Sequence, residues 1–226
     1  MPKINAVLFD VDGTLLDSHG EKSCARLFAV AKEKGLPDDE EKRALARKLW
    51  NTLPADVIVD ACWPGQNFEE IEKAWIAKDA DPAYLLPLIA GTEQMLLWLR
   101  ERGFALGLLT HRGSASAENI MKSHRISEFF SFAHTRNTLL PGGKNNPESA
   151  GIVRADLARR GMRTETTVFV GDSAVDLMFA RVLGTPFVGV LTGTMSFPDF
   201  VEHRHPEKMI IPSVASLPAL LTRWKE

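Results

Sequence analysis

The feature that most constrains the fold of this chain is a short, mostly apolar run that ends abruptly in acidic residues. Residues 4–9 read INAVLF, and Asp10, Asp12 and Gly13 follow at once. A run of this length and composition is typical of a strand buried on both faces of a parallel sheet. A carboxylate directly after a buried strand is costly unless it meets a cation or hydrogen-bond donors. The opening residues therefore predict a parallel sheet with a charged site at its carboxyl end.

Further apolar runs alternate with helical patterns in the second half of the chain. We expect strands at 104–109, 129–133, 167–170, 187–191 and 209–211, and helices at 92–102, 116–123, 148–160, 174–183 and 217–224. Strands alternating with helices at this spacing indicate βαβ units. The fold class is therefore predicted to be α/β, with a Rossmann-like parallel sheet core covered by helices on both faces.

The segment 16–88 has a different character, because strand signals disappear from it. Amphipathic helices are expected at 24–34, 40–50, 56–61 and 68–78, with Trp50, Trp63 and Trp75 packing among them rather than serving as a stacking platform. We expect residues 16–88 to form a small all-helical cap domain inserted after the first strand. Residues 1–15 and 89–226 would form the catalytic core.

Composition excludes several classes of function. The chain has 226 residues, 45% hydrophobic content and a formal net charge of -2, and it contains no long basic run of the kind that favours nucleic-acid binding. No apolar run approaches the length of a membrane span, and the first apolar run is too short for a secretory signal. We therefore expect a soluble cytoplasmic protein, monomeric or homodimeric, in which Cys24 and Cys62 are reduced and buried.

Polar residues follow three of the expected strands. Asp10 and Asp12 follow the first, Thr110 the second, and Asp172 the strand at 167–170. Ligands of open α/β sheets bind outside the carboxyl ends of the strands, so these side chains are expected to meet there. Carboxylates gathered at one edge would repel one another without a metal, and hard oxygen ligands open to water favour Mg²⁺.

Four motifs resemble those of the haloacid dehalogenase superfamily, in its phosphoglycolate phosphatase-like and β-phosphoglucomutase-like branch. Residues 10–15 (DVDGTL) resemble the first signature, Thr110 the second, Lys144 the third and residues 171–176 (GDSAVD) the fourth. The motifs occur in the family's order, and the resemblance spans residues 4 to about 191.

The resemblance implies a role for each matching residue. Asp10 would attack phosphorus and form an aspartyl-phosphate, while Asp12 would protonate the leaving oxygen and then activate water. Asp10, the backbone carbonyl of Asp12, and Asp172 would hold Mg²⁺. Thr110 would donate to a phosphoryl oxygen, and Lys144 would neutralise charge on the nucleophile and the phosphate.

The remaining candidates have supporting roles. Asp176, four residues after Asp172 on one helical face, is expected to orient Lys144 or a metal-bound water. Gly13, His111, Arg112 and Ser173 are candidates for binding substrate or phosphate. His203 and His205 are expected to be exposed loop residues rather than ligands.

Two departures from the family pattern stand out. Asn145 replaces the proline that usually follows the third-motif lysine, and Gly142 and Gly143 precede that lysine, so its loop is expected to be more flexible. The second motif reads Thr-His-Arg, where Thr-Asn or Ser-Asn is common. His111 and Arg112 are therefore either at the edge of the site or on the surface.

Three hypotheses for function follow from these motifs. The first is a Mg²⁺-dependent phosphatase that acts on a small phosphorylated metabolite, with the helical insert as a mobile cap. The second is a phosphomutase of the β-phosphoglucomutase type, and the third is a non-catalytic scaffold. Retention of Asp10, Asp12, Asp172 and Asp176 disfavours the scaffold. Asp12 separates the chain from dehalogenases, which lack an acid at that position. A phosphonatase is disfavoured because the insert offers no suitable Schiff-base lysine.

Overall fold

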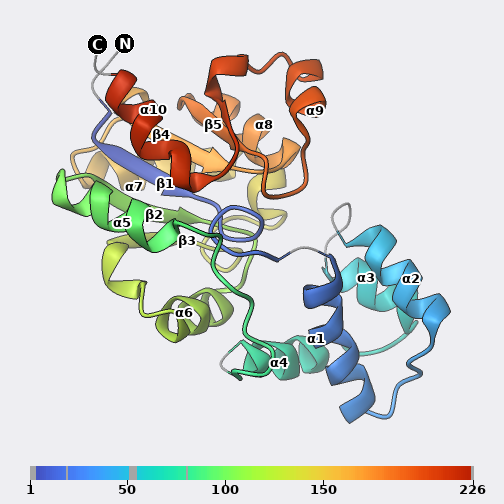
Figure 1. The fold of residues 1–226 in the computed structure, drawn as a ribbon. Helices are drawn as coiled ribbons and strands as arrows, with labels where there is room; N and C mark the ends of the chain where they lie inside the picture. Colours follow the sequence, from blue (N-terminus) through green and yellow to red (C-terminus); the bar gives the residue numbers. More distant parts are fainter. Residues whose placement is uncertain (1–3, 19, 51–54, 80, 225–226) are drawn as a thin grey trace. The chain divides into compact units, whose positions relative to one another are not determined.

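A computed structural model describes residues 4–18, 20–50, 55–79 and 81–224. The chain forms two compact units, one made of residues 1–17 and 87–226 and the other of residues 18–86. These boundaries lie two residues from those expected from the sequence. We call the first the sheet unit and the second the helical unit (Figure 1).

The sheet unit is built on a six-stranded sheet in which every pair is parallel. The strands are β1 (Ala6–Phe9), β2 (Ala105–Leu109), β3 (Phe132–His134), β4 (Thr167–Gly171), β5 (Phe187–Val190) and β6 (Ile210–Ile211), in the order β3-β2-β1-β4-β5-β6. The central strand β1 pairs Phe9 with Leu108 of β2 and with Val170 of β4. The three strands followed by the predicted chemistry are therefore adjacent.

Alternating side chains of each central strand enter two separate cores. Val7 and Phe9 belong to one core, and Ala6 and Leu8 to the other, as the period of two in a strand requires. Helices α5 (Thr92–Glu101), α6 (Ser114–Ser123) and α10 (Leu217–Arg223) cover the first core, and α7 (Ser149–Arg159), α8 (Ala174–Leu183) and α9 (Phe197–Glu202) cover the second (Figure 1). The predicted parallel sheet with helices on both faces is confirmed.

The two segments that lead out of and back into the sheet unit run antiparallel to each other. Leu16 and Leu88 form an antiparallel bridge, and the Asp17 amide donates to the Pro87 carbonyl at 2.9 Å. The Ile89 amide donates to the Leu15 carbonyl at 2.8 Å. These hydrogen bonds fix both ends of the insertion to the sheet unit.

The helical unit contains α1 (Gly20–Glu33), α2 (Glu40–Leu49), α3 (Ala55–Cys62) and α4 (Phe68–Lys78), packed around one apolar cluster. Trp63 is buried beside Phe28, with ring centroids 5.2 Å apart, and Trp50 contacts Trp75 at 5.3 Å. Trp63 is thus part of the core of the insert, as expected, whereas Trp50 and Trp75 are partly buried and pack against that core. Asn67 caps α4 by accepting from the Glu69 amide, which explains why this helix begins where the sequence predicted.

Local details of the sheet unit differ from the expectations. Helix α9 was not predicted, because its six residues are too few to show a helical period, although Ser196 and Asp199 form a capping box. The strand expected at 129–133 is shorter and later, since residues 127–129 form a 3₁₀ turn. His205 was expected to be exposed and is buried, with its ring 5.4 Å from that of Phe187. The sequence around His205 is that of a polar loop, so it did not predict the contact with Phe187.

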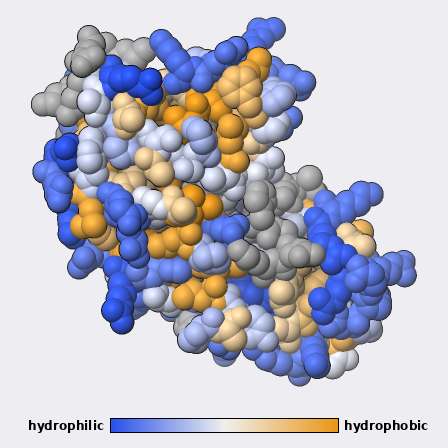
Figure 2. Space-filling model, in the orientation of Figure 1, coloured by the Kyte–Doolittle hydropathy of each residue, from blue (hydrophilic) through white to orange (hydrophobic). Residues whose placement is uncertain are grey.

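Among the described residues, none of the helices combines the length and apolar character needed to cross a membrane. Hydrophilic side chains cover much of the face seen in Figure 2, with apolar side chains between them. Cys24 and Cys62 are both buried, and within the described residues neither takes part in a disulfide bond, as expected.

Candidate active site at the carboxyl edge of the sheet

The carboxyl ends of four neighbouring strands bring the candidate residues together. Asp10 follows β1, Thr110 follows β2, Asp172 follows β4, and Thr194 lies in the loop after β5. Asp10 and Thr110 are fixed to the sheet by their own amides, which donate to the carbonyls of Val170 and His134 at 2.9 Å each. The backbone of these residues is therefore held rigidly at the edge of the sheet, which positions their side chains precisely.

A tight turn after β1 places Asp12 and folds the chain back. The amides of Leu15 and Leu16 both donate to the Val11 carbonyl at 2.9 Å, and the Gly13 amide donates to the Leu16 carbonyl at 2.9 Å. Gly13 has a φ of 71°, and a Cβ atom there would lie 2.6 Å from Asp172 Oδ2. Glycine is therefore required at this position both for its backbone conformation and for the close approach of Asp172.

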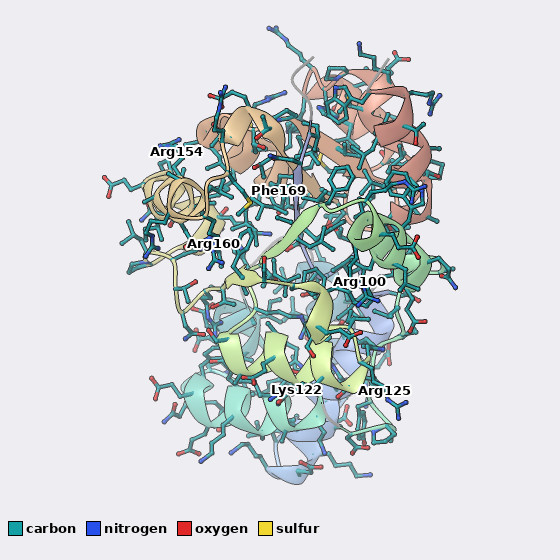
Figure 3. All side chains as sticks on the ribbon, turned by 90° about the vertical axis from the view of Figure 1, so that its left-hand side faces the viewer. Arg100, Lys122, Arg125, Arg154, Arg160 and Phe169 are labelled. Atoms are coloured by element: carbon teal, nitrogen blue, oxygen red, sulfur yellow. The ribbon has the colours of Figure 1, made fainter. Side chains whose placement is uncertain are left out.

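Lys144 bridges two buried carboxylates. Its Nζ donates to Asp10 Oδ1 at 2.7 Å and to Asp176 Oδ1 at 2.5 Å. Burial alone would lower the pKa of Lys144, but the charges of Asp10 and Asp176 outweigh it and raise that pKa, so the ammonium group stays protonated. The ring of Phe169, a β4 residue labelled in Figure 3, lies below the ammonium group with its centroid 5.8 Å from Nζ.

The acidic residues are held at an energetic cost. Burial is the largest effect on Asp10 and raises the pKa of its carboxyl group well above the ordinary value, opposed by Lys144 and reinforced by Asp176 and Asp172. Burial, then the charge of Asp176, raises the pKa of Asp172 to about 6, even though Thr194 donates to it. One lysine is therefore too little positive charge for this cluster.

A divalent cation would supply the missing charge, and the donor set fits one. Asp10, Asp172 and Asp176 are all buried, and each offers a carboxylate oxygen within 4.8 Å of the others. Hard carboxylate oxygens are the ligands that Mg²⁺ and Ca²⁺ prefer. The site is thus suited to a metal ion.

Asp172 is aligned by a loop that was not among the predicted site residues. Its Oδ2 accepts from the Thr194 amide at 2.7 Å and from Thr194 Oγ1 at 2.9 Å, while Thr14 Oγ1 donates to Oδ1 at 3.3 Å. Thr192 Oγ1 donates to the Gly13 carbonyl at 2.7 Å and ties this loop to the first turn. The signal was available, because residues 192–194 (TGT) are polar and glycine-containing and directly follow a predicted strand.

Arg112 pairs with Asp12 in a two-point contact. Its Nε donates to Asp12 Oδ2 at 2.7 Å and its Nη2 to Asp12 Oδ1 at 2.6 Å, and Nη1 donates to Ser116 Oγ at 2.9 Å. The guanidinium plane matches the carboxylate in the geometry that gives such pairs their directionality. Arg112 therefore lies at the candidate site, where its partner is Asp12, the predicted acid/base residue.

The other candidates have partners within the protein. The buried Thr110 hydroxyl accepts from the Arg112 amide at 3.2 Å, and His111 Nε2 accepts from the Lys144 amide at 2.8 Å. Ser173 is the N-cap of α8, and its hydroxyl and amide both donate to Asp176 Oδ2, at 2.6 and 3.2 Å. This capping box fixes the carboxylate that contacts Lys144.

A parallel α/β unit with a lysine-bridged acidic cluster at its carboxyl edge has the features of an enzyme active site that could hold a metal ion. The model of the family described as haloacid dehalogenase-like hydrolase matches residues 7–190. The chain therefore belongs to the haloacid dehalogenase-like hydrolase family.

Similar proteins have closely related names. A phosphoglycolate phosphatase of Yersinia pestis is 28% identical over 232 residues, covering 96% of this chain and 93% of that protein. A haloacid dehalogenase-like hydrolase from Streptococcus pneumoniae has the same fold at 20% identity, with a TM-score of 0.71 and full coverage of both chains. A Thermotoga maritima protein with a proposed β-phosphoglucomutase assignment is 20% identical, with a TM-score of 0.74 and coverage of 97% and 99%. The predicted family and enzyme class, a haloacid dehalogenase-like phosphatase, are confirmed.

Proposed function

We propose that this enzyme hydrolyses a small phosphomonoester with Mg²⁺ through an aspartyl-phosphate on Asp10. The observation that carries the proposal is the contact of Lys144 with both Asp10 and Asp176, beside Asp172. Lys144 fixes one oxygen of the Asp10 carboxylate, which orients the group for attack. It also brings positive charge to the place where a transferring phosphoryl group needs it.

The first half-reaction transfers the phosphoryl group to the enzyme. A carboxylate oxygen of Asp10 attacks phosphorus, the bond from phosphorus to the ester oxygen breaks, and Asp12 gives its proton to the leaving alkoxide. In the second half-reaction Asp12 takes a proton from water. That water attacks the phosphorus of the aspartyl-phosphate, releasing phosphate and restoring Asp10. Thr110 donates its hydroxyl to a phosphoryl oxygen.

Asp10, Asp172 and the backbone carbonyl of Asp12 are the proposed ligands of Mg²⁺. When bound, the ion offsets the charge of the carboxylates and of the phosphate. Arg112 holds Asp12 through both carboxylate oxygens before substrate binds. Proton transfer then requires one Asp12 oxygen to exchange its arginine contact for the ester oxygen of the substrate.

The names of the relatives supply the first substrate to test, which is 2-phosphoglycolate. We propose that the helical unit acts as the cap that selects the substrate. It has its own apolar core, and it is joined to the sheet unit by two segments that run antiparallel at Leu16 and Leu88. A separate unit on two connections is suited to gating access to a site.

The test is a phosphate-release assay with p-nitrophenyl phosphate and 2-phosphoglycolate, with Mg²⁺ and with EDTA. We expect metal-dependent turnover that Asp10→Asn reduces by a factor of at least about 10³, as removal of a nucleophile does. Glu165→Gln, which changes an exposed carboxylate of the sheet unit, serves as the control and should leave turnover unchanged. Turnover that survives both EDTA and Asp10→Asn would refute the proposed mechanism.

A phosphomutase is the second candidate, and the structural match to the Thermotoga maritima protein favours it. A mutase would use the same Asp10 but return the phosphoryl group to a sugar. Incubation with a hexose 1-phosphate and a trace of the corresponding bisphosphate separates the two. Isomerised sugar phosphate without release of phosphate supports the mutase, whereas stoichiometric phosphate release supports the phosphatase.

A further inference from the structure

His111 and the loop of Lys144 lie 33 positions apart in the chain and meet at the edge of the site. The Lys144 amide donates to His111 Nε2 at 2.8 Å. An amide can only donate, so Nε2 accepts, and a neutral ring carries its proton on Nδ1. His111 thus contacts the backbone of the residue whose side chain bridges Asp10 and Asp176.

The Lys144 amide needs an acceptor from elsewhere. Lys144 lies in the 3₁₀ helix η2 (Gly143–Asn145), where the amides of the first turn have no carbonyl within the helix to bond. The neighbouring amides of Gly143 and Asn145 donate to the carbonyls of Leu140 and Gly142, at 2.9 and 3.0 Å. The His111 ring takes the place of a backbone carbonyl for the amide between them.

The two glycines before Lys144 make room for this ring. Gly142 and Gly143 have φ values of 93° and 58°, both in the left-handed region. A Cβ atom on Gly143 would lie 2.9 Å from His111 Cδ2 and 3.0 Å from Nε2. The ring therefore packs directly on the Gly143 backbone, and a side chain at that position would displace it.

The two departures from the family pattern thus belong to one contact. The loop lacks the usual proline after its lysine and has a glycine pair before it, and the second motif has a histidine at 111. Asn146 fixes the far side of the loop, because its Nδ2 donates to the Pro141 carbonyl and its Oδ1 accepts from the Glu148 amide, both at 3.0 Å. The loop was expected to be flexible, but His111 restrains it on one side and Asn146 on the other.

We infer that His111 is a positioning residue, which holds the backbone of Lys144 so that its ammonium group reaches Asp10 and Asp176. The expected effect of His111 on turnover rests on the proposed function, whereas its structural role does not. Burial, and then the charge of Lys144, lowers the pKa of His111 to about 4, so the ring remains a neutral acceptor across the physiological range. His111 does not itself act on the reacting atoms.

The test compares substitutions that keep or remove the acceptor. His111→Phe preserves a planar ring without an acceptor, and His111→Gln supplies a carbonyl oxygen. We expect His111→Phe to lower kcat by about 10- to 100-fold with a smaller change in KM, since a misplaced supporting group costs turnover by that factor. His111→Gln should recover much of the loss. Equal loss in both variants, or none in His111→Phe, would overturn the inference.

A second measurement does not depend on activity. Nitrogen chemical shifts of the ring should show an unprotonated Nε2 and a protonated Nδ1 in the wild type at pH 7.5. Exchange of the Lys144 amide with solvent should be slow in the wild type and faster in His111→Phe. A ring protonated on Nε2 would overturn the inference even in an active enzyme. An inactive wild type with the expected tautomer would instead count against the proposed function alone.

Discussion

The low pKa of His111 predicts how stability changes in mild acid. In the folded protein the pKa is about 4, whereas the ordinary value, which the unfolded chain adopts, is 6.5. The unfolded state therefore binds the proton more readily than the folded state does. The stability that depends on a neutral ring is complete above pH 6.5 and is lost as the pH falls toward 4.

The size of the effect follows from these two values. At pH 7.5 the ring is neutral in both states, whereas at pH 5 it is mostly protonated only in the unfolded chain. The difference lowers the free energy of unfolding by about 2 kcal/mol between pH 7.5 and pH 5. The raised pKa values of Asp10 and Asp172 act in the opposite direction, so the wild-type change alone is not diagnostic.

The assay is urea unfolding of the metal-free wild type, His111→Phe and His111→Gln at both pH values. Both variants lack the titrating ring, so each should lose about 2 kcal/mol less than the wild type between pH 7.5 and pH 5. His203→Gln, which removes an exposed ring, controls for the general loss of an imidazole. If the free energy of unfolding changes by the same amount in the variants and the wild type, within about 0.5 kcal/mol, then the inference that His111 is buried and neutral is wrong.

Three further predictions concern the residues around the acidic cluster. Asp172→Asn should raise the stability of the metal-free protein by about 1–3 kcal/mol, because it removes a buried carboxyl group whose pKa is raised to about 6. In this variant Mg²⁺ should no longer raise the melting temperature. Arg112→Lys should lower kcat about tenfold, since an ammonium group cannot make the two-point contact with Asp12; an unchanged kcat would show that this contact has no part in turnover. Gly193→Ala should destabilise the fold by about 2 kcal/mol in thermal unfolding, because its Cβ would overlap Asp172, and a neutral effect would mean that the loop can move away.

The elements that the sequence predicted well are those with strong local signals. Helices α4 and α8 have the predicted bounds, since each begins at a side-chain cap, Asn67 and Ser173. The strand before Asp10 was evident from an apolar run that ends in a charge. Within the candidate site, Asp10, Thr110 and Asp172 were placed together by one rule, that parallel strands end at a common edge.

What the sequence could not predict depends on contacts between distant residues. The pairing of Arg112 with Asp12 spans 100 positions, and the hydrogen bond from the Lys144 amide to His111 spans 33. Neither contact has a periodic or compositional signal, because each is made by the fold that brings the loops together. The burial of His205 against Phe187 is of the same kind.

Rapid acid quenching would detect whether Asp10 carries the phosphoryl group during turnover, as we propose. The enzyme would be mixed with Mg²⁺ and a good phosphomonoester substrate, quenched in acid within one turnover, and digested for mass spectrometry. We expect one added phosphoryl group on the peptide that contains Asp10, and none in Asp10→Asn. Turnover without a phosphorylated Asp10 peptide, or a phosphoryl group on another residue, would contradict the proposal.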